Sequence, residues 1–268
     1  MGSERIAIGL DGGVAHVELT REDKLNAMDG EMFAAIGEAF RSLGTDSRVR
    51  AILLSSRGRH FSAGIDLQYA AGQFPPSNDP GRAAEARLRH IRFLQDAFSA
   101  VEEARAPVIA AIQGGCIGAG VDLASACDLR VAAPDSYFQV AEVDVAITAD
   151  LGTLQRLGHL IPHGVLRELT FTGRRMEAEE AAGYGLVNRI AESPVDAGRD
   201  LARTTSAKSP LAVAGAKLSL NYSRGRPVEE GLRHVALWNA GTLVSADLGE
   251  AIRARLGKAS PEFGPLED

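Results

Sequence analysis

The sequence is poor in sulfur and in aromatic residues. Its 268 residues include 2 cysteines and 1 tryptophan, and aromatic residues make up 5% of the chain. Cys116 and Cys127 fit neither a disulfide framework nor a zinc-binding pattern, and the histidines are scattered, so we expect buried, reduced thiols and no metal site. With so few aromatic rings, the core must consist mainly of aliphatic side chains.

The sequence also lacks the features by which nucleic-acid-binding, membrane-bound and targeted proteins are recognised. The net charge is −6 and no basic block occurs, so a nucleic-acid partner is not expected. No apolar run is long enough to span a bilayer, so no membrane partner is expected. The first residues, MGSERIAIGLDGG, lack an apolar signal core, and the last, GPLED, are not a peroxisomal address, so we expect a cytoplasmic protein.

What the chain does contain is an alternation of strand and helix patterns up to about residue 158, followed by mostly helical patterns. Two short alternating runs flank Asp11-Gly12-Gly13 and predict a hairpin. Buried strands are predicted over 49–54 and 108–112, helices over 31–43, 82–105 and 159–170, and a loop over 70–81. The helical pattern from residue 210 onward has breaks near 225–227 and at 245. The order predicts an α/β fold, divided into a core over 1–205 and a C-terminal helical region over 206–268.

A glycine cluster follows the strand over 108–112 and precedes a helical segment over 121–126. A helix that starts after such a turn presents unpaired N–H groups. The spacing is not a dinucleotide fingerprint, because the third glycine is absent after Gly118 and Gly120, and Asp122 would repel a pyrophosphate. The turn either permits close packing alone or stabilises an oxyanion, and a second glycine loop over 61–66 favours a site with two donors.

Three carboxylates lie in otherwise apolar surroundings: Asp122, Glu142 and Asp150. Each has an ordinary structural explanation, which is the commoner one when each residue is taken singly. Asp122 could be a first-turn acid favoured by the helix dipole, Glu142 a solvated loop acid and Asp150 a helix N-cap. Together they could instead move protons next to the glycine turn.

Four motifs carry a resemblance to a known family. They are Lys24-Leu25-Asn26-Ala27, the segment HFSAGIDL over 60–67, Gly118-Ala119-Gly120 and the segment GTLQRL over 152–157. On these the chain resembles the crotonase, or enoyl-CoA hydratase/isomerase, superfamily. Within it the chain is most similar to the Δ3,5-Δ2,4-dienoyl-CoA isomerases, which carry Asp, Glu and Asp at the three acid positions. Hydratases carry glutamates at the first two and no acid at the third.

The resemblance implies the fold, the assembly and the reaction. The fold would be a ββα spiral with two roughly perpendicular sheets and a C-terminal helical trimerisation region, assembled as a homotrimer or homohexamer. The substrate would be a 3,5-dienoyl-CoA thioester, isomerised to the 2,4-dienoyl form in fatty-acid degradation. No cofactor is implied, because coenzyme A is part of the substrate.

The resemblance also implies roles for individual residues. Glu142 would take the C2 proton, Asp150 would deliver one at C6, and Asp122 would tune the pair. The N–H groups of Ile65 and Ala119 would form the oxyanion hole, although the subfamily usually has glycine where this chain has Ala119. The residues that would contact the acyl-CoA are Lys24, Asn26, Ala27, Ser62, Ala63, Gly64, Ile65, Asp66 and Gly120.

Two other functions fit the same motifs. A 2-enoyl-CoA hydratase needs two carboxylates to activate one water, but Asp122 is one methylene shorter than the glutamate expected there. A non-catalytic homologue that binds acyl-CoA is the second alternative, and the retention of all three acids argues against it.

Overall fold

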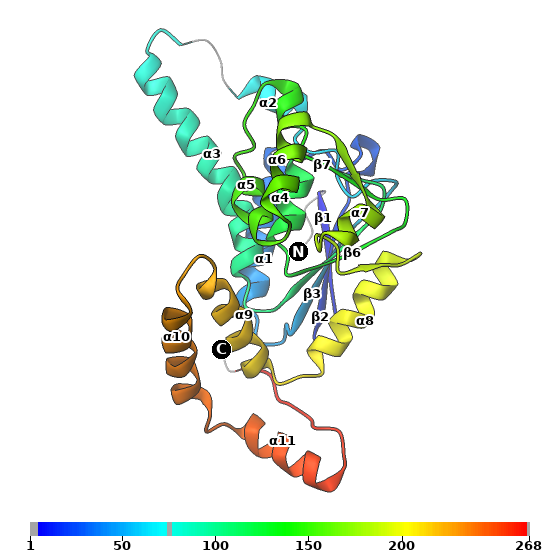
Figure 1. Cartoon of the computed structure of the whole chain (residues 1–268), viewed down its shortest axis with the longest axis vertical. Helices are drawn as coiled ribbons and strands as arrows, with labels where there is room; N and C mark the ends of the chain where they lie inside the picture. The colour runs from blue at the N-terminus through cyan, green and yellow to red at the C-terminus, as the bar shows by residue number, and fades with distance from the viewer. Residues whose placement is uncertain (1–4, 74–76, 267–268) are drawn as a thin grey trace.

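The computed structural model describes residues 5–73 and 77–266 (Figure 1). Its main element is a six-stranded sheet in the order β1-β2-β3-β4-β6-β9. The first pair is antiparallel and all later neighbours are parallel. The strands of this sheet are β1 (Ile6–Asp11), β2 (Val14–Leu19), β3 (Ala51–Ser56), β4 (Val108–Ile112), β6 (Leu129–Ala132) and β9 (Arg189–Ile190).

The predicted hairpin is confirmed, and its turn explains its sequence. Asp11 pairs directly with Val14, so Gly12 and Gly13 form a two-residue turn. Both glycines have positive φ, at 54° and 83°, which is the conformation that such a turn demands. The predicted strands over 49–54 and 108–112 are confirmed as β3 and β4, each buried along its whole length because helices cover both faces of the sheet.

Helices pack on both faces of this sheet (Figure 1). On one face, α1 (Gly30–Thr45) packs against α3 (Pro80–Glu103), with the rings of Phe33 and Phe98 5.3 Å apart. On the other face, α8 (Pro194–Ser206) lies on β3 and β4. The remaining helices of the α/β part are short: η1 (Glu22–Lys24), α2 (Leu67–Gly72), α4 (Ala119–Ala126), η2 (Glu142–Val145), α5 (Thr153–Arg156), η3 (Leu157–His159), α6 (His163–Thr172) and α7 (Ala178–Gly183).

A second, three-stranded sheet agrees with the two sheets that the family resemblance implied, but the local sequence pattern did not predict its strands. It consists of β5 (Gly115–Ile117), β7 (Tyr137–Gln139) and β8 (Arg175–Glu177). The glycine cluster is therefore not a single turn from strand to helix, because β5 lies between Gly114 and Gly118. Strands of three residues are too short for an alternating pattern to reveal them.

Two helix boundaries also differ from the predictions. The helix expected from residue 159 begins at His163, because Pro162 stands immediately before it as the N-cap. The loop expected over 70–81 begins inside α2, and residues 74–76 of that loop lie outside the described residues.

The C-terminal helices follow the α/β part and extend away from it (Figure 1). They are α9 (Pro210–Ser223), α10 (Val228–Thr242) and α11 (Ala246–Gly257), with breaks at the positions that the sequence predicted. The division of the chain into domains at residue 205 stays a prediction. Within the ranges described, no helix is long and apolar enough to cross a membrane.

A nearly buried ion pair fastens α9 to the sheet. The Lys217 ammonium lies 2.7 Å from Asp128 Oδ2 and donates to the Ala106 carbonyl at 3.2 Å. The same carboxylate oxygen accepts the Val108 N–H at 2.7 Å, so one acid joins α9 to the start of β4.

We expect Lys217→Met to lower the free energy of unfolding by about 2–3 kcal/mol, because the change leaves Asp128 without its cation in a poorly hydrated place. Urea denaturation measures this directly. Lys208→Met is the matched control, since Lys208 is exposed, and it should change stability by less than about 0.5 kcal/mol. Equal stability of the two variants would show that the ion pair does not hold α9.

Candidate active site

Two backbone segments meet at Gly64 and Gly118. Gly64 has φ +92°, and a Cβ there would lie 2.9 Å from the Ile117 carbonyl oxygen. Gly118 has φ +50°, and a Cβ there would lie 3.4 Å from Glu142 Oε1 and 3.9 Å from Gly64 Cα. Both positions therefore need glycine for conformation, and Gly64 needs it for space as well.

This approach brings two unused N–H groups close together. The Gly64 carbonyl accepts the Met28 N–H at 2.7 Å, so the Ile65 N–H of the same trans peptide points away from Met28. Ala119 is the first residue of α4, where an N–H has no partner inside the helix. Neither N–H has an acceptor among the residues described, and a Cβ at Gly64 would lie 3.6 Å from the Ala119 nitrogen.

Buried polar side chains hold the loop before Ile65 in shape. The Asn26 amide donates to the carbonyls of Arg57 at 2.8 Å and His60 at 2.9 Å, and its oxygen accepts the Arg21 N–H at 3.0 Å. The Ser62 hydroxyl donates to the Asn26 carbonyl at 2.8 Å and accepts the Gly64 N–H at 3.1 Å. The side chains of Asn26 and Ser62 are therefore used inside the protein, and a ligand could meet only the backbone at these positions.

Arg21 is a residue that the sequence patterns did not single out. Its guanidinium donates to the Ala27 carbonyl at 2.6 Å and to Asp66 Oδ2 at 2.8 Å, so it joins the two loops that carry the predicted ligand contacts. Asp66 also caps α2, and the bond from Arg21 lowers its pKa. No periodic pattern marks an arginine in a polar loop, which is why this link was missed. Lys24 is exposed, with no ion pair within the described part of the chain.

Asp122 lies in the first turn of α4, and its side chain points to the start of α5. Its carboxylate accepts the Thr153 N–H at 2.6 Å, and the residue is 1% exposed. Burial raises the pKa of Asp122 to about 6, while hydrogen bonding from Thr153 and the positive charge of Arg156 offset part of that rise. Asp122 therefore links α4 to α5 and adds a buried acid to the site.

Glu142 begins η2 and lies against Gly118, next to the two unused N–H groups. Its Oε2 is buried and has no hydrogen-bond partner among the described residues. Burial, followed by the negative charges of Asp122 and Asp150, raises the pKa of Glu142 to about 7. The interpretation of Glu142 as a solvated loop acid is therefore wrong.

Asp150 lies just before α5 and does not cap that helix. The N-cap position belongs to Gly152, and the Asp150 backbone carbonyl accepts the Gln95 side-chain amide at 2.6 Å. Burial raises the pKa of Asp150, although its side chain stays partly accessible. The N-cap interpretation of Asp150 is therefore wrong as well.

The structure thus gathers the three predicted acids into one electrostatic cluster beside two unused N–H groups. Burial raises the pKa of Asp122 to about 6 and that of Glu142 to about 7, so these two acids can both take up and release protons at physiological pH. Convergent N–H groups stabilise a carbonyl oxygen that gains negative charge. Among the described residues, no group of three or more His, Cys, Asp or Glu side chains is placed to hold a metal ion.

Comparisons with known proteins agree with this geometry. A family profile described as Enoyl-CoA hydratase/isomerase matches residues 9–264. The chain is 43% identical to the peroxisomal Delta(3,5)-Delta(2,4)-dienoyl-CoA isomerase of Arabidopsis thaliana, over 98% of this chain and 97% of that one. It is also 43% identical to the mitochondrial enzyme of the same name from Rattus norvegicus, over 91% of this chain and 77% of that one.

Solved structures share the fold. An enoyl-CoA hydratase from Bacillus anthracis superposes with a TM-score of 0.88 at 27% identity, covering 97% of this chain and 98% of its own. A putative enoyl-CoA hydratase from Streptomyces coelicolor A3(2) gives a TM-score of 0.89 at 30% identity, covering 97% of this chain and 94% of its own.

The expectation of a cytoplasmic protein is overturned by these relatives. The Arabidopsis enzyme is named as peroxisomal, and the rat and human enzymes as mitochondrial. The expectation came from the two ends of the chain. The compartment of a protein is determined by short targeting signals that receptors bind, so it does not follow from composition or fold.

Glu142 should make stability depend on pH. A carboxyl whose pKa rises from 4.5 to about 7 on folding favours the folded protein only while it is protonated. Wild type should therefore lose about 1–3 kcal/mol relative to Glu142→Gln as the pH rises from 4.5 to 7. Urea titrations of both proteins across this range measure the difference, and a difference that does not change with pH would show that Glu142 is not desolvated.

Proposed function

The chain belongs to the enoyl-CoA hydratase/isomerase family, and from that premise we propose that it isomerises 3,5-dienoyl-CoA to 2,4-dienoyl-CoA by a C2-to-C6 proton shift. Two dienoyl-CoA isomerases that are 43% identical over more than nine-tenths of this chain support the activity. The observation that carries the proposal is a third acid, Asp150, in the same electrostatic cluster as Asp122 and Glu142. A proton shift along a diene needs a group at each end of it.

The N–H groups of Ile65 and Ala119 form the oxyanion hole in this proposal. The thioester oxygen accepts a hydrogen bond from each as negative charge spreads over the dienolate. Their lack of other acceptors in the described chain supports the role, because a donor already in use would have to break a bond first. Loss of one such donor typically costs roughly 10²–10³ in rate.

Glu142 is the base and takes the proton from C2. Its carboxyl lies against Gly118, adjacent to Ala119, so a thioester held at the oxyanion hole places C2 next to it. Asp150 is the acid and delivers a proton at C6. Asp122 keeps α5 in place through Thr153 and raises the pKa of Glu142 by its charge.

The reaction needs Glu142 to be ionised and Asp150 to be protonated. Burial raises the pKa of Glu142 to about 7, whereas Asp150 is only partly buried, so the protein alone does not impose these two states. An acyl chain laid over Asp150 excludes its water and raises its pKa further. The substrate thereby completes the split in pKa values that the reaction requires.

The CoA portion lies along the loops joined by Arg21. Ala27, Ala63 and Gly64 belong to these loops, and the exposed Lys24 supplies a cation for a phosphate. No separate cofactor takes part, because coenzyme A arrives with the substrate. A hydratase would use only the first two acids and would leave Asp150 without a role.

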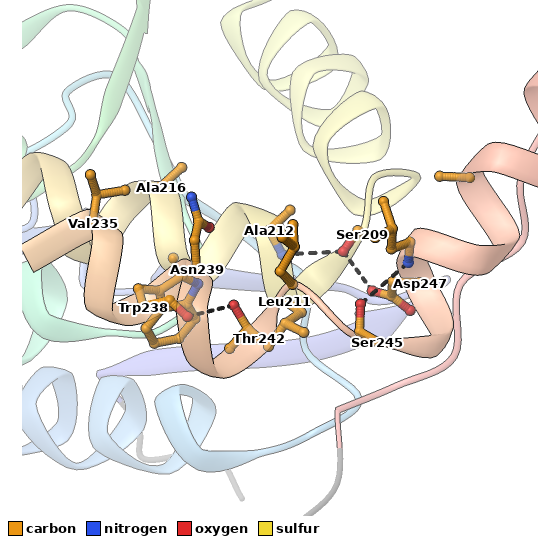
Figure 2. A pocket seen from close by; sticks show the side chains of 14 residues that line it. Ser209, Leu211, Ala212, Ala216, Val235, Trp238, Asn239, Thr242, Ser245 and Asp247 are labelled. Carbon is orange, nitrogen blue, oxygen red and sulfur yellow. Dashed lines mark hydrogen bonds between the residues drawn. The ribbon is translucent and has the colours of Figure 1, made fainter. Parts of the chain in front are cut away.

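The C-terminal helices provide a face for assembly. The sequence predicts that apolar residues of this region, such as Leu232 and Leu237, are buried within the subunit or against a neighbouring one. Leu232 is 62% exposed and Leu237 is 77% exposed in the subunit, which leaves a neighbouring copy to cover them. An apolar pocket of about 340 Å³ lies between α9, α10 and α11, with Trp238 and Leu211 on its walls (Figure 2). A further copy of the chain, in a trimer or hexamer, would cover this apolar surface.

Asp150→Asn is expected to lower isomerisation by roughly 10²–10⁴, because the amide cannot deliver a proton at C6. The same variant should retain exchange of the C2 proton with deuterated solvent, whereas Glu142→Gln should lose it. Ultraviolet absorption follows 2,4-dienoyl-CoA, and NMR follows the exchange. A folded Asp150→Asn protein that isomerises at the wild-type rate would reduce the assignment to a generic crotonase.

Light scattering at micromolar concentration should give the mass of a trimer or hexamer. Leu237→Glu places a charge on the exposed face of α10 and is expected to shift the distribution to smaller species. Leu10→Glu, at an exposed leucine on the edge strand β1, should leave the mass unchanged. A wild-type protein that is monomeric throughout this range contradicts the assembly.

A further inference from the structure

An ion cluster of Arg156, Glu102 and Arg224 lies next to the segment that carries Asp150. Arg156 of α5 donates from Nε to Glu102 Oε2 at 2.9 Å, and the Arg156 side chain is 12% exposed. Arg224, which follows α9, pairs with the other oxygen of Glu102. One carboxylate of α3 therefore joins α5 and the end of α9.

Arg156 also folds back onto the residues that follow Asp150. Its Nη1 donates to the Leu151 carbonyl at 3.1 Å. Gly152 has φ +129°, and a Cβ there would lie 1.8 Å from Arg156 Nη1. The guanidinium therefore lies directly against the Gly152 backbone, a place that only glycine leaves open.

The segment that carries Asp150 is thus tied to α3 at two points. Gln95 donates to the Asp150 carbonyl at 2.6 Å, and Glu102 holds Arg156 at 2.9 Å. Gln95 and Glu102 are seven residues apart, which places both on one face of α3. These two bonds to α3 fix the position and the orientation of the segment that carries Asp150.

The segment would have room to move without these ties. A pocket of about 410 Å³ opens beside it, and several polar side chains line that pocket. Water can fill such a pocket and compete for the Asp150 carbonyl and carboxyl. The lining residues include Gln95, Ser99, Gln155, Arg156, His159 and Arg224.

We propose that Arg156, anchored on Glu102, is the positioning residue that holds Asp150 at the C6 end of the diene. It rests on the proposed function. Among the described residues, the hydrogen bonds of Arg156 go to Glu102 and to the Leu151 carbonyl, and none goes to Glu142, Ile65 or Ala119. Arg156 therefore governs delivery of the C6 proton and leaves removal of the C2 proton intact.

Arg156 has a second effect that the test must separate. Its positive charge lowers the pKa of the buried Asp122. Arg156→Lys keeps a positive charge but cannot bridge Glu102 and the Leu151 carbonyl with one planar group. Arg156→Gln removes both the charge and the bridge.

The test measures isomerisation and C2 exchange in parallel. Arg156→Gln, Arg156→Lys and Glu102→Gln are each expected to lower kcat for isomerisation by about 10–100-fold, because misplacement of a reacting group by about 1 Å costs up to 10²-fold. Exchange of the C2 proton with deuterated solvent should stay within about twofold of wild type in Arg156→Lys and Glu102→Gln, which keep the positive charge near Asp122. The double variant Arg156→Gln with Glu102→Gln should be no slower than either single variant, since both break the same tie.

Arg174→Gln is the matched control. Arg174 makes ion pairs with Glu168 and Glu180, in α6 and α7, and the change should leave both rates unaltered. Thermal denaturation of each variant reports its fold, and if Arg156→Gln does not fold, Arg156→Lys and Glu102→Gln carry the test.

If the wild-type protein isomerises 3,5-dienoyl-CoA, two results would overturn the inference. One is a loss of C2 exchange in step with isomerisation, which means general damage to the site. The other is full activity of Arg156→Lys, which means that charge alone matters. A wild-type protein that does not isomerise 3,5-dienoyl-CoA would overturn the proposed function and this inference with it.

Discussion

The close approach of two backbone segments at Gly64 and Gly118 is the constraint on which the site depends. A side chain at Gly64 would meet the Ile117 carbonyl at 2.9 Å, so any larger residue forces the segments apart. Their separation decides whether the N–H groups of Ile65 and Ala119 can reach one oxygen. The hydrogen bonds of Asn26, Ser62 and Arg21 all act to keep one of these two segments in place.

The acids are placed by the same architecture and at a cost in stability. Asp122 comes from α4, which starts directly after Gly118, and its bond to Thr153 fixes the start of α5. One carboxylate oxygen of Glu142 is buried and has no hydrogen-bond partner among the described residues. Such an atom is unfavourable in a folded protein, and it is the kind of departure from ordinary packing that marks a reactive site.

The sequence allowed most of the large elements to be predicted, because long apolar patterns reflect burial directly. The hairpin, β3, β4, α1 and α3 follow from such patterns. The strands of the small sheet do not, because three residues carry no period. The family motifs identified the three acids, although spacing alone left each with an ordinary structural explanation.

Other parts of the site depend on contacts that no local pattern records. The side chains of Asn26 and Ser62 turn inward, and this follows only from the loop conformation. Arg21 and Arg156 act across tens of residues of sequence, on Asp66 and Glu102. Long-range pairs of this kind become visible only once the fold has brought the partners together.

The most direct test of the account is a crystal structure with an unreactive dienoyl-CoA analogue bound. The account predicts that the thioester oxygen accepts hydrogen bonds from both Ile65 N–H and Ala119 N–H. It also predicts that the Glu142 carboxyl lies beside C2 and the Asp150 carboxyl beside C6. A thioester oxygen bound elsewhere, or a C6 atom out of reach of Asp150, would contradict it.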